Sequence, residues 1–311
     1  MIQPLKQSLG VNRIHRVTGI INGTTNYILT RMTVEGGEFA NILADAQELG
    51  FAEADPTADV DGLDAGDKIA ILASLAFGGR IKREDVYCEG IRKISATDIA
   101  YADKLNFVIK LLAIAERLED GKVSVRVHPT FVPKDLPLAT VNGVYNAILV
   151  EGEPLGQVMF FGPGAGAGAT ASAVVSDLLA IVGVINCNPN REEAILRGRG
   201  SANESPSTSL NPLLSCSHIH YSEMAPLSSL RSSFYVRFLC MDVPGVIGKL
   251  GTCFGAHHVS IESIVQTGFQ GDRAEIVVVT HDVSEADFES ALAEIRGLDA
   301  ISSIASIIRV F

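Results

Sequence analysis

The stretch that most constrains the fold is an acidic segment that leads directly into an apolar run. Residues 51–68 contain six carboxylates and a single lysine, and residues 69–77 are apolar apart from one serine. A charge run of this density is usually a solvated surface, whereas a helix that is apolar all round is buried. Together they predict a surface loop that turns into a buried helix at about residues 62–77.

Asp64 and Lys68 lie at the start of this predicted helix, four residues apart. Asp61 and Gly62 mark the helix start, with Asp64 near the position of a capping box. The i,i+4 spacing places Asp64 and Lys68 on one face, and we expect Lys68 to point toward the interior with Ile71. A buried lysine needs a partner. On spacing alone, an ion pair that stabilises the helix is favoured over a catalytic pair.

Composition restricts the class of protein. The chain has 311 residues, a formal net charge of −11 and a pI of about 5.1, which argues against nucleic acid or an anionic membrane as the main partner. Its five cysteines are dispersed, as expected for reduced thiols in a cytoplasmic protein. The sequence shows neither a signal peptide nor an apolar run of about 18 residues. We therefore expect a cytoplasmic globular protein of two or three domains.

The first 160 residues predict an α+β layer. Helices are expected from Gly23 onward and at 38–49, 62–77 and 105–118, with strands at 15–21, 122–128, 142–150 and 157–161. Residues 1–10 resemble the end of a strand that runs into a short helix. Strands that follow helices favour an open, largely antiparallel sheet covered on one side. Gly23 and Thr24 open a helix, where free N–H groups favour an anion such as a substrate carboxylate, although plain capping is the simpler interpretation.

A glycine-rich loop, residues 162–168, joins the last of these strands to a helix at 169–182. Gly162, Gly164 and Ala167 fit a relaxed G-x-G-x-x-A dinucleotide pattern. We discount that match, because no βαβ unit surrounds it and no acidic residue follows about twenty positions later. Close helix–strand packing and the approach of a ligand to the backbone are the two remaining interpretations.

Residues 189–231 are rich in Asn, Ser, Pro and Arg, which is typical of a linker. Within it, Cys216, His218 and His220 place three possible metal ligands on one side of an extended segment. Because no fourth ligand follows at a usual spacing, we do not expect a metal site there.

The residues after the linker predict a separate module. We expect strands at 233–242, 259–267, 274–280 and 301–311, with helices at 244–254 and 284–295. Pro244 is at the start of the first helix, a favoured position, and residues 270–272 form a hairpin turn. The order βαββαβ is that of a ferredoxin-like domain.

Three segments of the first 186 residues resemble the catalytic part of homoserine dehydrogenase. They are Thr18–Ile28 (TGIINGTTNYI), Ala46–Lys68 (AQELGFAEADPTADVDGLDAGDK) and the glycine loop. Residues 233–311, with the motif DVPGV at 242–246, resemble an ACT domain, a small-molecule regulatory module. The resemblance implies an α+β fold: an open catalytic and dimerisation β-sheet covered by helices, a remnant of a Rossmann domain, and a C-terminal ferredoxin-like ACT domain.

The resemblance also implies an activity, the NAD(P)H-dependent interconversion of L-aspartate 4-semialdehyde and L-homoserine in threonine, methionine and isoleucine biosynthesis. Asp64 and Lys68 match the catalytic pair of the family, and a protonated lysine suits the negative charge that hydride addition builds on the aldehyde oxygen. Substrate contacts are implied at Glu53, Asp59, Gly23, Thr24 and Phe51. A place near the cofactor is implied for Gly162, Gly164 and Gly166. A regulatory ligand, threonine, is implied at Asp242, Gly245, Val246 and Ile247.

The N-terminal nucleotide-binding half of the family, with its glycine fingerprint, has no counterpart in this sequence. We expect residues 1–15 and 156–186 to be a remnant of that half, and residues 16–155 to be the catalytic and dimerisation domain. Residues 187–231 are then the linker and residues 232–311 the ACT domain. On this interpretation the chain is a truncated homoserine dehydrogenase that is weakly active or inactive alone.

Two other functions remain open. One is a dimer that senses an amino acid through its ACT domain without catalysis; the other is a scaffold completed by a separate nucleotide-binding chain. The sequence does not distinguish NAD from NADP, because the discriminating residues belong to the absent half. An open sheet and an ACT domain both favour pairing. We therefore expect a homodimer or homotetramer that binds a small-molecule substrate and neither nucleic acid nor membrane.

Overall fold

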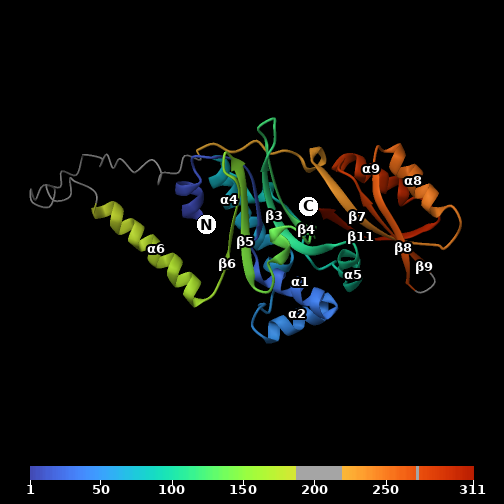
Figure 1. The fold of residues 1–311 in the computed structure, drawn as a ribbon, viewed down its shortest axis with the longest axis horizontal. Coiled ribbons are helices and arrows are strands. Elements are labelled where there is room, and N and C mark those ends of the chain that lie inside the picture. The colour runs from blue at the N-terminus through green and yellow to red at the C-terminus, as the bar shows by residue number, and fades with distance from the viewer. Residues whose placement is uncertain (187–218, 271–272) are drawn as a thin grey trace, which may run out of the picture.

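A computed structural model of the chain describes residues 1–186, 219–270 and 273–311. The described chain is elongated, with a helix-covered sheet in its centre and a second α/β unit at one end (Figure 1). Helix α6 (Ala167–Asn186) projects from the other end. Within the described residues both units share one sheet, with the strand order β6-β5-β1-β3-β4-β11-β7-β9-β8.

Five long strands form the antiparallel part of this sheet. In spatial order they are β6 (Gly156–Pro163), β5 (Tyr145–Glu153), β1 (Arg13–Ile20), β3 (Phe107–Arg117) and β4 (Val123–Pro133). Every neighbouring pair in this set is antiparallel, and Val17 of β1 pairs with Ala115 and with Val150. The short strand β2 (Tyr87–Cys88) pairs in parallel with β4. The prediction of an open, largely antiparallel sheet is confirmed.

The prediction of a helix at residues 105–118 is wrong, because this segment forms strand β3. Its sequence is almost continuously apolar, and such a run does not distinguish a buried helix from a strand covered on both faces. β3 lies between β1 and β4. Leu111 is buried in the core under the helices, whereas Leu112 is buried on the opposite face. Burial on both faces removes the alternation that identifies a half-exposed strand.

Helices cover one face of the first unit's sheet. They are α1 (Gly23–Glu35), α2 (Phe39–Glu48), α3 (Thr57–Val60), α4 (Leu63–Phe77) and α5 (Ala96–Lys104), with a 3-10 turn at Arg83–Asp85. Their apolar side chains, such as Ile28, Ile69 and Ile99, form the main core with Leu111 and Val127 of the sheet. A smaller core on the opposite face is covered by the 3-10 turn at Pro137–Thr140.

Two local predictions differ from the structure. Helix α5 was not predicted, although Ser95 and Asp98 form a capping box at its start, a signal that the sequence carries. In residues 1–10 the expected short helix is present, as a π-helical turn at Pro4–Ser8, but the expected strand end before it is not. Pro4 has no N–H to donate to a strand ladder, and Leu5 packs into the main core.

The C-terminal unit has the predicted βαββαβ order. Its elements are β7 (Arg231–Cys240), α8 (Val246–Ala256), β8 (Ile261–Gln270), β9 (Arg273–Thr280), α9 (Glu285–Ile295) and β11 (Ile301–Val310), with the short β10 (Val283–Ser284) beside β7. A separate core contains Phe238, Phe254 and Phe288. The hairpin turn expected at 270–272 lies mostly outside the described residues.

A parallel pair of strands joins the two units, and we call this contact the junction. Arg309 of β11 pairs with Thr130 of β4. Tyr235 of β7 stacks on Phe131 of β4, with 4.4 Å between ring centroids. The C-terminal unit is therefore attached to the first sheet by backbone pairing and by packed aromatic rings.

The predicted linker is described only from residue 219 onward. There, Tyr221 forms an isolated bridge to Arg80, and Met224 forms one to Val123. Leu230 is buried. The last part of the predicted linker therefore packs against the body of the protein before β7 begins.

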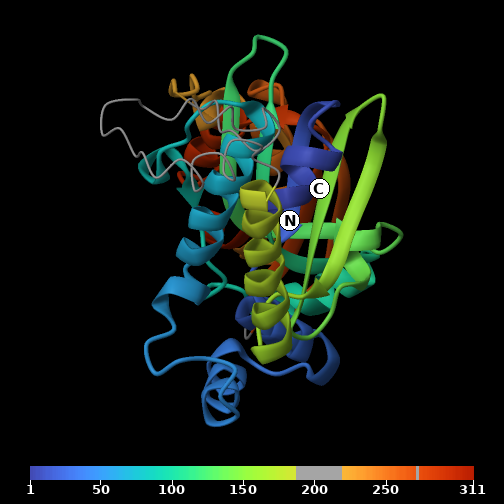
Figure 2. The same ribbon diagram turned by 90° about the vertical axis from the view of Figure 1, so that its left-hand side faces the viewer.

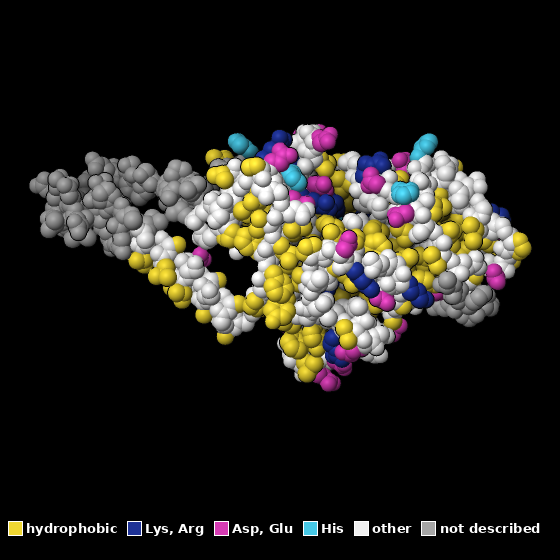
Figure 3. Space-filling view, viewed as in Figure 1, with side chains coloured by type: hydrophobic (Ala, Val, Ile, Leu, Met, Phe, Trp, Pro, Cys, Tyr) yellow, Lys and Arg dark blue, Asp and Glu magenta, His cyan; other side chains and the backbone are white. Residues whose placement is uncertain are grey.

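Helix α6 extends away from the glycine loop (Figures 1 and 2). Large apolar side chains on it are exposed. The space-filling view shows these side chains along the helix (Figure 3). The large ones are Val174, Val175, Leu178, Leu179, Ile181 and Val182. An exposed apolar surface of this kind marks an interaction site. Among the described helices, none combines the length and apolarity required to cross a membrane.

Candidate active site

Asn22, just after β1, ties two acidic side chains to the start of α1. Its amide nitrogen donates to Asp59 Oδ1 at 2.6 Å and to Asp64 Oδ2 at 2.9 Å. Its amide oxygen accepts from the backbone N–H of Thr25 and so caps α1. Asn22 itself is buried. One amide group therefore holds both carboxylates in place, a role that the sequence analysis missed.

Lys68 adds a cation to this group. Its Nζ lies 2.7 Å from Asp64 Oδ2 and 3.3 Å from the backbone oxygen of Ile21. The expected pairing of Asp64 with Lys68 is therefore present. The expectation that Lys68 points into the core is wrong, because 50% of its side chain is exposed and Ile71 is 55% exposed. The face of α4 that carries Lys68 and Ile71 lines a cavity. Some apolar side chains of this helix are therefore exposed, although its sequence is apolar all round.

Backbone geometry fixes the start of α4. Gly62 is the N-cap residue and has a φ of +78°, a conformation that glycine adopts without steric cost. A Cβ at Gly62 would lie 3.1 Å from Val127 of β4, so the helix begins close to the sheet. Asp61, just before it, pairs with Arg92. The predicted helix start is confirmed, but the capping box does not form because the N-cap is glycine.

Gly23, Thr24 and Phe51 meet near the start of α1. Thr24 Oγ1 donates to the backbone oxygen of Phe51 at 3.0 Å. The Phe51 ring packs on Tyr27, with 4.5 Å between ring centroids. A Cβ at Gly23 would lie 3.0 Å from the backbone oxygen of Val144. The structure thus brings three of the residues expected to contact substrate into one neighbourhood.

Glu53 and Asp55 lie in the exposed loop between α2 and α3. Gln47 Nε2 donates to the backbone oxygen of Glu53 at 2.9 Å, which fixes the course of the loop. Hydrogen bonds from Thr57 lower the pKa of the Asp55 carboxyl. The carboxylate of Glu53 is exposed and lies outside the group that Asn22 organises.

A cavity of about 630 Å³ lies beside Lys68 and is also lined by the glycine loop and α6. Gly162 and Gly164 border it, and a Cβ at Gly164 would lie 1.6 Å from Asn146 Oδ1. The buried Nδ2 of Asn146 has no hydrogen-bond partner within the described part of the chain. Gly166, with a φ of +104°, lies at the turn into α6 and outside this lining. Lys68, bare glycine backbone and an unpaired amide donor therefore share one cavity.

A second cavity, of about 410 Å³, lies at the start of α8. It is lined by all four residues expected to contact a regulatory ligand: Asp242, Gly245, Val246 and Ile247. Gln266 of β8 also lines it and donates to Asp242 Oδ1 at 3.5 Å. The first N–H groups of a helix have no intrahelical partner and favour anions. This cavity therefore suits the carboxylate of a small amino acid.

The three candidate metal ligands are only partly described. Cys216 and His218 lie outside the described residues. His220 accepts a hydrogen bond from the Arg80 backbone N–H at 2.8 Å through its own backbone oxygen. Across residues 1–186, 219–270 and 273–311, no group of three or more His, Cys, Asp or Glu side chains is arranged to hold a metal ion.

Comparison with known families accounts for both units. Residues 1–179 match the homoserine dehydrogenase family. The chain belongs to that family. Residues 234–300 match the ACT domain. Homoserine dehydrogenases are oxidoreductases that use NAD(P), so the expected family, its enzyme class and the C-terminal ACT domain are confirmed.

Individual homoserine dehydrogenases match the whole chain. The chain is 62% identical over 313 residues to the enzyme of Synechocystis sp. and 38% identical over 311 residues to that of Neisseria gonorrhoeae. These alignments cover 100% of this chain and 69% and 68% of the two relatives. A crystal structure of a homoserine dehydrogenase from Thiobacillus denitrificans is similar with a TM-score of 0.89 at 34% identity, covering 100% of this chain and 67% of that one. The alternative of a regulatory protein without catalysis is not better supported by these matches.

Proposed function

We propose that this chain binds L-homoserine and L-aspartate 4-semialdehyde beside Lys68 and takes part in their NAD(P)-dependent interconversion. This reaction belongs to threonine, methionine and isoleucine biosynthesis. The observation that carries the proposal is the hydrogen-bonded group Asn22, Asp59, Asp64 and Lys68, placed next to the cavity that the glycine loop lines.

Lys68 is assigned as the proton donor. Reduction of an aldehyde builds negative charge on its oxygen, and an ammonium group both neutralises that charge and supplies the proton. Two of its three N–H donors are directed at Asp64 and at the Ile21 backbone oxygen. The third is available for the substrate oxygen. Asp64 holds the ammonium in place, and Asn22 in turn holds Asp64.

Asp59 and Glu53 are assigned to the amino group and the hydroxyl of the amino-acid substrate. Carboxylates recognise an ammonium group through charge-assisted hydrogen bonds and accept a hydrogen bond from a hydroxyl. Asn22 fixes Asp59 from one side, whereas Glu53 lies on the exposed loop that also carries Phe51. Gly23, Thr24 and Phe51 complete the substrate side at the start of α1.

The glycine loop fits the nicotinamide end of an NAD(P) cofactor. Open space beside the bare backbone of Gly162 and the unpaired amide donor of Asn146, which packs against Gly164, suit a flat ring that carries a carboxamide. A cofactor bound there supplies the hydride. Gly166 is assigned to the turn that positions this loop at the start of α6. Comparing NADH with NADPH in the same assay decides which nucleotide is used.

Binding of L-homoserine, measured by isothermal titration calorimetry, tests the substrate side separately from catalysis. We expect Lys68→Met and Asp59→Asn each to weaken binding about tenfold or more, because a hydrogen bond to a charged group contributes about 1.5–3 kcal/mol. In NADPH-dependent reduction, Lys68→Met lowers kcat about 100-fold or more. Lys82→Met is the matched control, since 48% of the Lys82 side chain is exposed. Unchanged kcat and homoserine affinity in Lys68→Met would refute the assignment.

The ACT match and the cavity at α8 support a second, regulatory function. We assign Asp242, Gly245, Val246 and Ile247 to a threonine site, with Asp242 recognising the ammonium group. Calorimetry with L-threonine is expected to show saturable binding that Asp242→Asn weakens about tenfold or more. Asp299→Asn, at an exposed site, serves as the control. Absence of heat with threonine would contradict the assignment.

We also propose the domain boundaries drawn from the sequence and an assembly of two or four copies. The boundaries are 1–15 with 156–186, then 16–155, 187–231 and 232–311. Limited proteolysis within residues 187–231 is expected to leave two folded fragments that stay associated, since each unit has its own core and β11 pairs with β4. Sedimentation equilibrium measures the oligomeric state, and a monomer at all concentrations would contradict pairing.

A further inference from the structure

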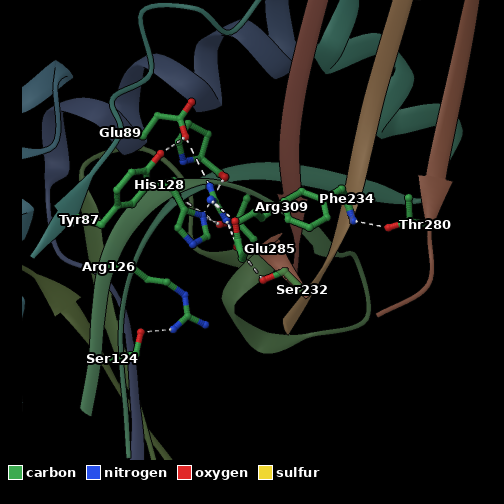
Figure 4. A network of polar contacts seen from close by, with 12 residues as sticks. Tyr87, Glu89, Ser124, Arg126, His128, Ser232, Phe234, Thr280, Glu285 and Arg309 are labelled. Atoms are coloured by element: carbon green, nitrogen blue, oxygen red, sulfur yellow. Dashed lines mark hydrogen bonds and ion pairs between the residues drawn. The ribbon is translucent and has the colours of Figure 1, made fainter. Parts of the chain in front are cut away.

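The junction contains a polar cavity of about 220 Å³, here called the junction cavity. Strands β1, β3 and β4 line one side, and β7, β11 and the turn before β10 line the other. Its lining includes four arginines and a histidine: Arg16, Arg126, His128, Arg231 and Arg309. Figure 4 shows Arg126 and His128 extending from the same strand, with Arg309 and Ser232 beside them. The cavity is far larger than the roughly 30 Å³ occupied by one water molecule.

Two nitrogen atoms of residues in this lining are buried without a hydrogen-bond partner in the described part of the chain. They are Arg126 Nε and His128 Nε2. Arg126 is 6% exposed and His128 is 2% exposed. Arg16 Nε also lacks a hydrogen bond, but it faces Glu151 Oε2 at 3.8 Å, and the Arg16 guanidinium stacks on Phe311. Because native proteins rarely leave buried polar atoms unpaired, the two atoms indicate a ligand that carries several acceptors.

Two of the four arginines are closely paired with carboxylates and contribute little free charge. Arg309 makes two hydrogen bonds of 2.7 Å to Glu285. Arg231, exposed at the rim, pairs with Asp282 at 2.6 Å. Both ion pairs lie on the side of the cavity that the C-terminal unit forms.

The other two arginines are loosely paired. The nearest carboxylate oxygens lie 3.4 Å from Arg126, in Glu116, and 3.8 Å from Arg16, in Glu151. Burial lowers the pKa of Arg126, and the neighbouring Glu116 offsets this only in part. Positive charge on the side of the first unit is therefore incompletely neutralised.

His128 is arranged to gain a proton when an anion binds. Its Nδ1 lies 3.1 Å from the backbone oxygen of Pro129, which can only accept, and 3.0 Å from Thr130 Oγ1. The Thr130 hydroxyl donates its own proton to the backbone oxygen of His128, so we assign the ring proton to Nδ1. In the neutral ring, Nε2 then carries a lone pair and can only accept a hydrogen bond. It becomes a donor only when the ring is protonated to the imidazolium. Burial, together with Arg309 and Arg126, lowers the pKa of His128 well below its ordinary range. An anion bound next to Nε2 favours the imidazolium and therefore raises the pKa of His128.

We propose that the junction cavity binds a tetrahedral oxyanion, either inorganic phosphate or the phosphate group of a small monoester. The donors are Arg126 Nε and protonated His128 Nε2, and the Arg16 guanidinium adds positive charge to the lining. The bound anion contacts both units and holds the ACT unit against the catalytic sheet. Proton uptake makes its affinity rise as the pH falls. Arg309 and Arg126 are the charged groups that act on the ring. The other charged groups of the lining are Arg16, Glu116, Arg231 and Asp282, and Arg309 also contacts Glu285 and Glu89.

Isothermal titration calorimetry at constant ionic strength tests the proposal with sulfate, phosphate and glycerol 3-phosphate. Sulfate does not titrate near neutral pH, so its heats in two buffers of different ionisation enthalpy report proton uptake by the protein. We expect one site per chain and uptake of up to one proton. Binding of phosphate without binding of glycerol 3-phosphate supports inorganic phosphate as the ligand. Binding of both supports the phosphate group of a monoester. Saturable binding of none of the three overturns the proposal.

Variants locate the binding site. Arg126→Met is expected to weaken sulfate binding about tenfold or more, and Arg16→Met, with a more exposed side chain, tests the same site if Arg126→Met does not fold. Arg31→Met is the matched control, because it removes the same charge from an ion pair on α1. His128→Gln is expected to abolish proton uptake. Sulfate affinity that is unchanged in both the Arg126 and Arg16 variants overturns the proposal.

Discussion

Arg237 is the side chain whose removal should most weaken the junction. It lies on β7, where its Nε contacts Asp98 Oδ1 of α5 at 2.9 Å and its Nη1 contacts Glu275 Oε1 of β9 at 3.0 Å. The side chains of Arg237, Asp98 and Glu275 are 6%, 0% and 8% exposed. One guanidinium thus compensates two carboxylates that solvent hardly reaches.

We expect Arg237→Met to lower the free energy of unfolding by about 3–5 kcal/mol, because it leaves buried carboxylates without their cation. Tyr235 still donates to Asp98, and Tyr101 to Glu275, which argues for the lower half of this range. Asp98→Asn in the Arg237→Met background removes one of the unpaired charges. The loss of unfolding free energy in the double variant should therefore be smaller than the sum of the losses in the two single variants.

Urea denaturation followed by far-UV circular dichroism measures these changes, since the chain contains no tryptophan. Lys134→Met is the matched control, because Lys134 pairs with Asp103 on the same helix α5 but at an exposed site. Its loss should stay within about 1 kcal/mol. A loss below about 1 kcal/mol in Arg237→Met would refute the reasoning, because it would mean that the buried carboxylates do not need the guanidinium.

Three further predictions follow from other sites. Burial lowers the pKa of the Lys110 ammonium in the folded protein to about 8, whereas its pKa in the unfolded chain is about 10.4. The free-energy cost of burying the charged ammonium is therefore present below about pH 8 and decreases as the pH rises toward about 10.4. The wild-type free energy of unfolding should therefore rise by about 1–2 kcal/mol relative to Lys110→Met between pH 7 and 9.5, and parallel pH profiles in urea denaturation would contradict this. Gly164→Ala, which forces Asn146 to move, should lower kcat/KM about tenfold or more, whereas Gly168→Ala, with open space around its Cβ, should not. Gly62→Ala should destabilise the fold by about 1 kcal/mol or more in thermal unfolding, since its φ is positive.

The parts of the fold that follow from local sequence signals were predicted well. Helix α4 has a clear start signal at Asp61 and Gly62, and the C-terminal βαββαβ unit has clear turn residues; both are observed. Strand β3 was mistaken for a helix because its position inside the sheet buries both Leu111 and Leu112. Pairing with distant strands decided its conformation, and that pairing is not encoded in the local pattern.

The candidate site shows the same division between local and long-range information. The i,i+4 spacing was sufficient to predict the pairing of Asp64 with Lys68. The role of Asn22 was missed because its partners Asp59 and Asp64 are 37 and 42 residues away in sequence. The exposure of Lys68 was missed because an apolar helix face that lines a cavity has the same sequence as one buried in a core.

The hydrogen bonds of Asn22 also have a consequence for chemical ageing. Asn22 precedes Gly23, and Asn–Gly is the dipeptide in which side-chain deamidation is easiest, because glycine leaves the attacking backbone nitrogen unhindered. Here both amide hydrogens are donated to carboxylates and the amide oxygen caps a helix, which holds the amide away from the reactive geometry. Deamidation would replace two donors by a third negative charge beside Asp59 and Asp64. Aged protein would then lose substrate binding while it stays folded, and it would carry a more acidic charge variant.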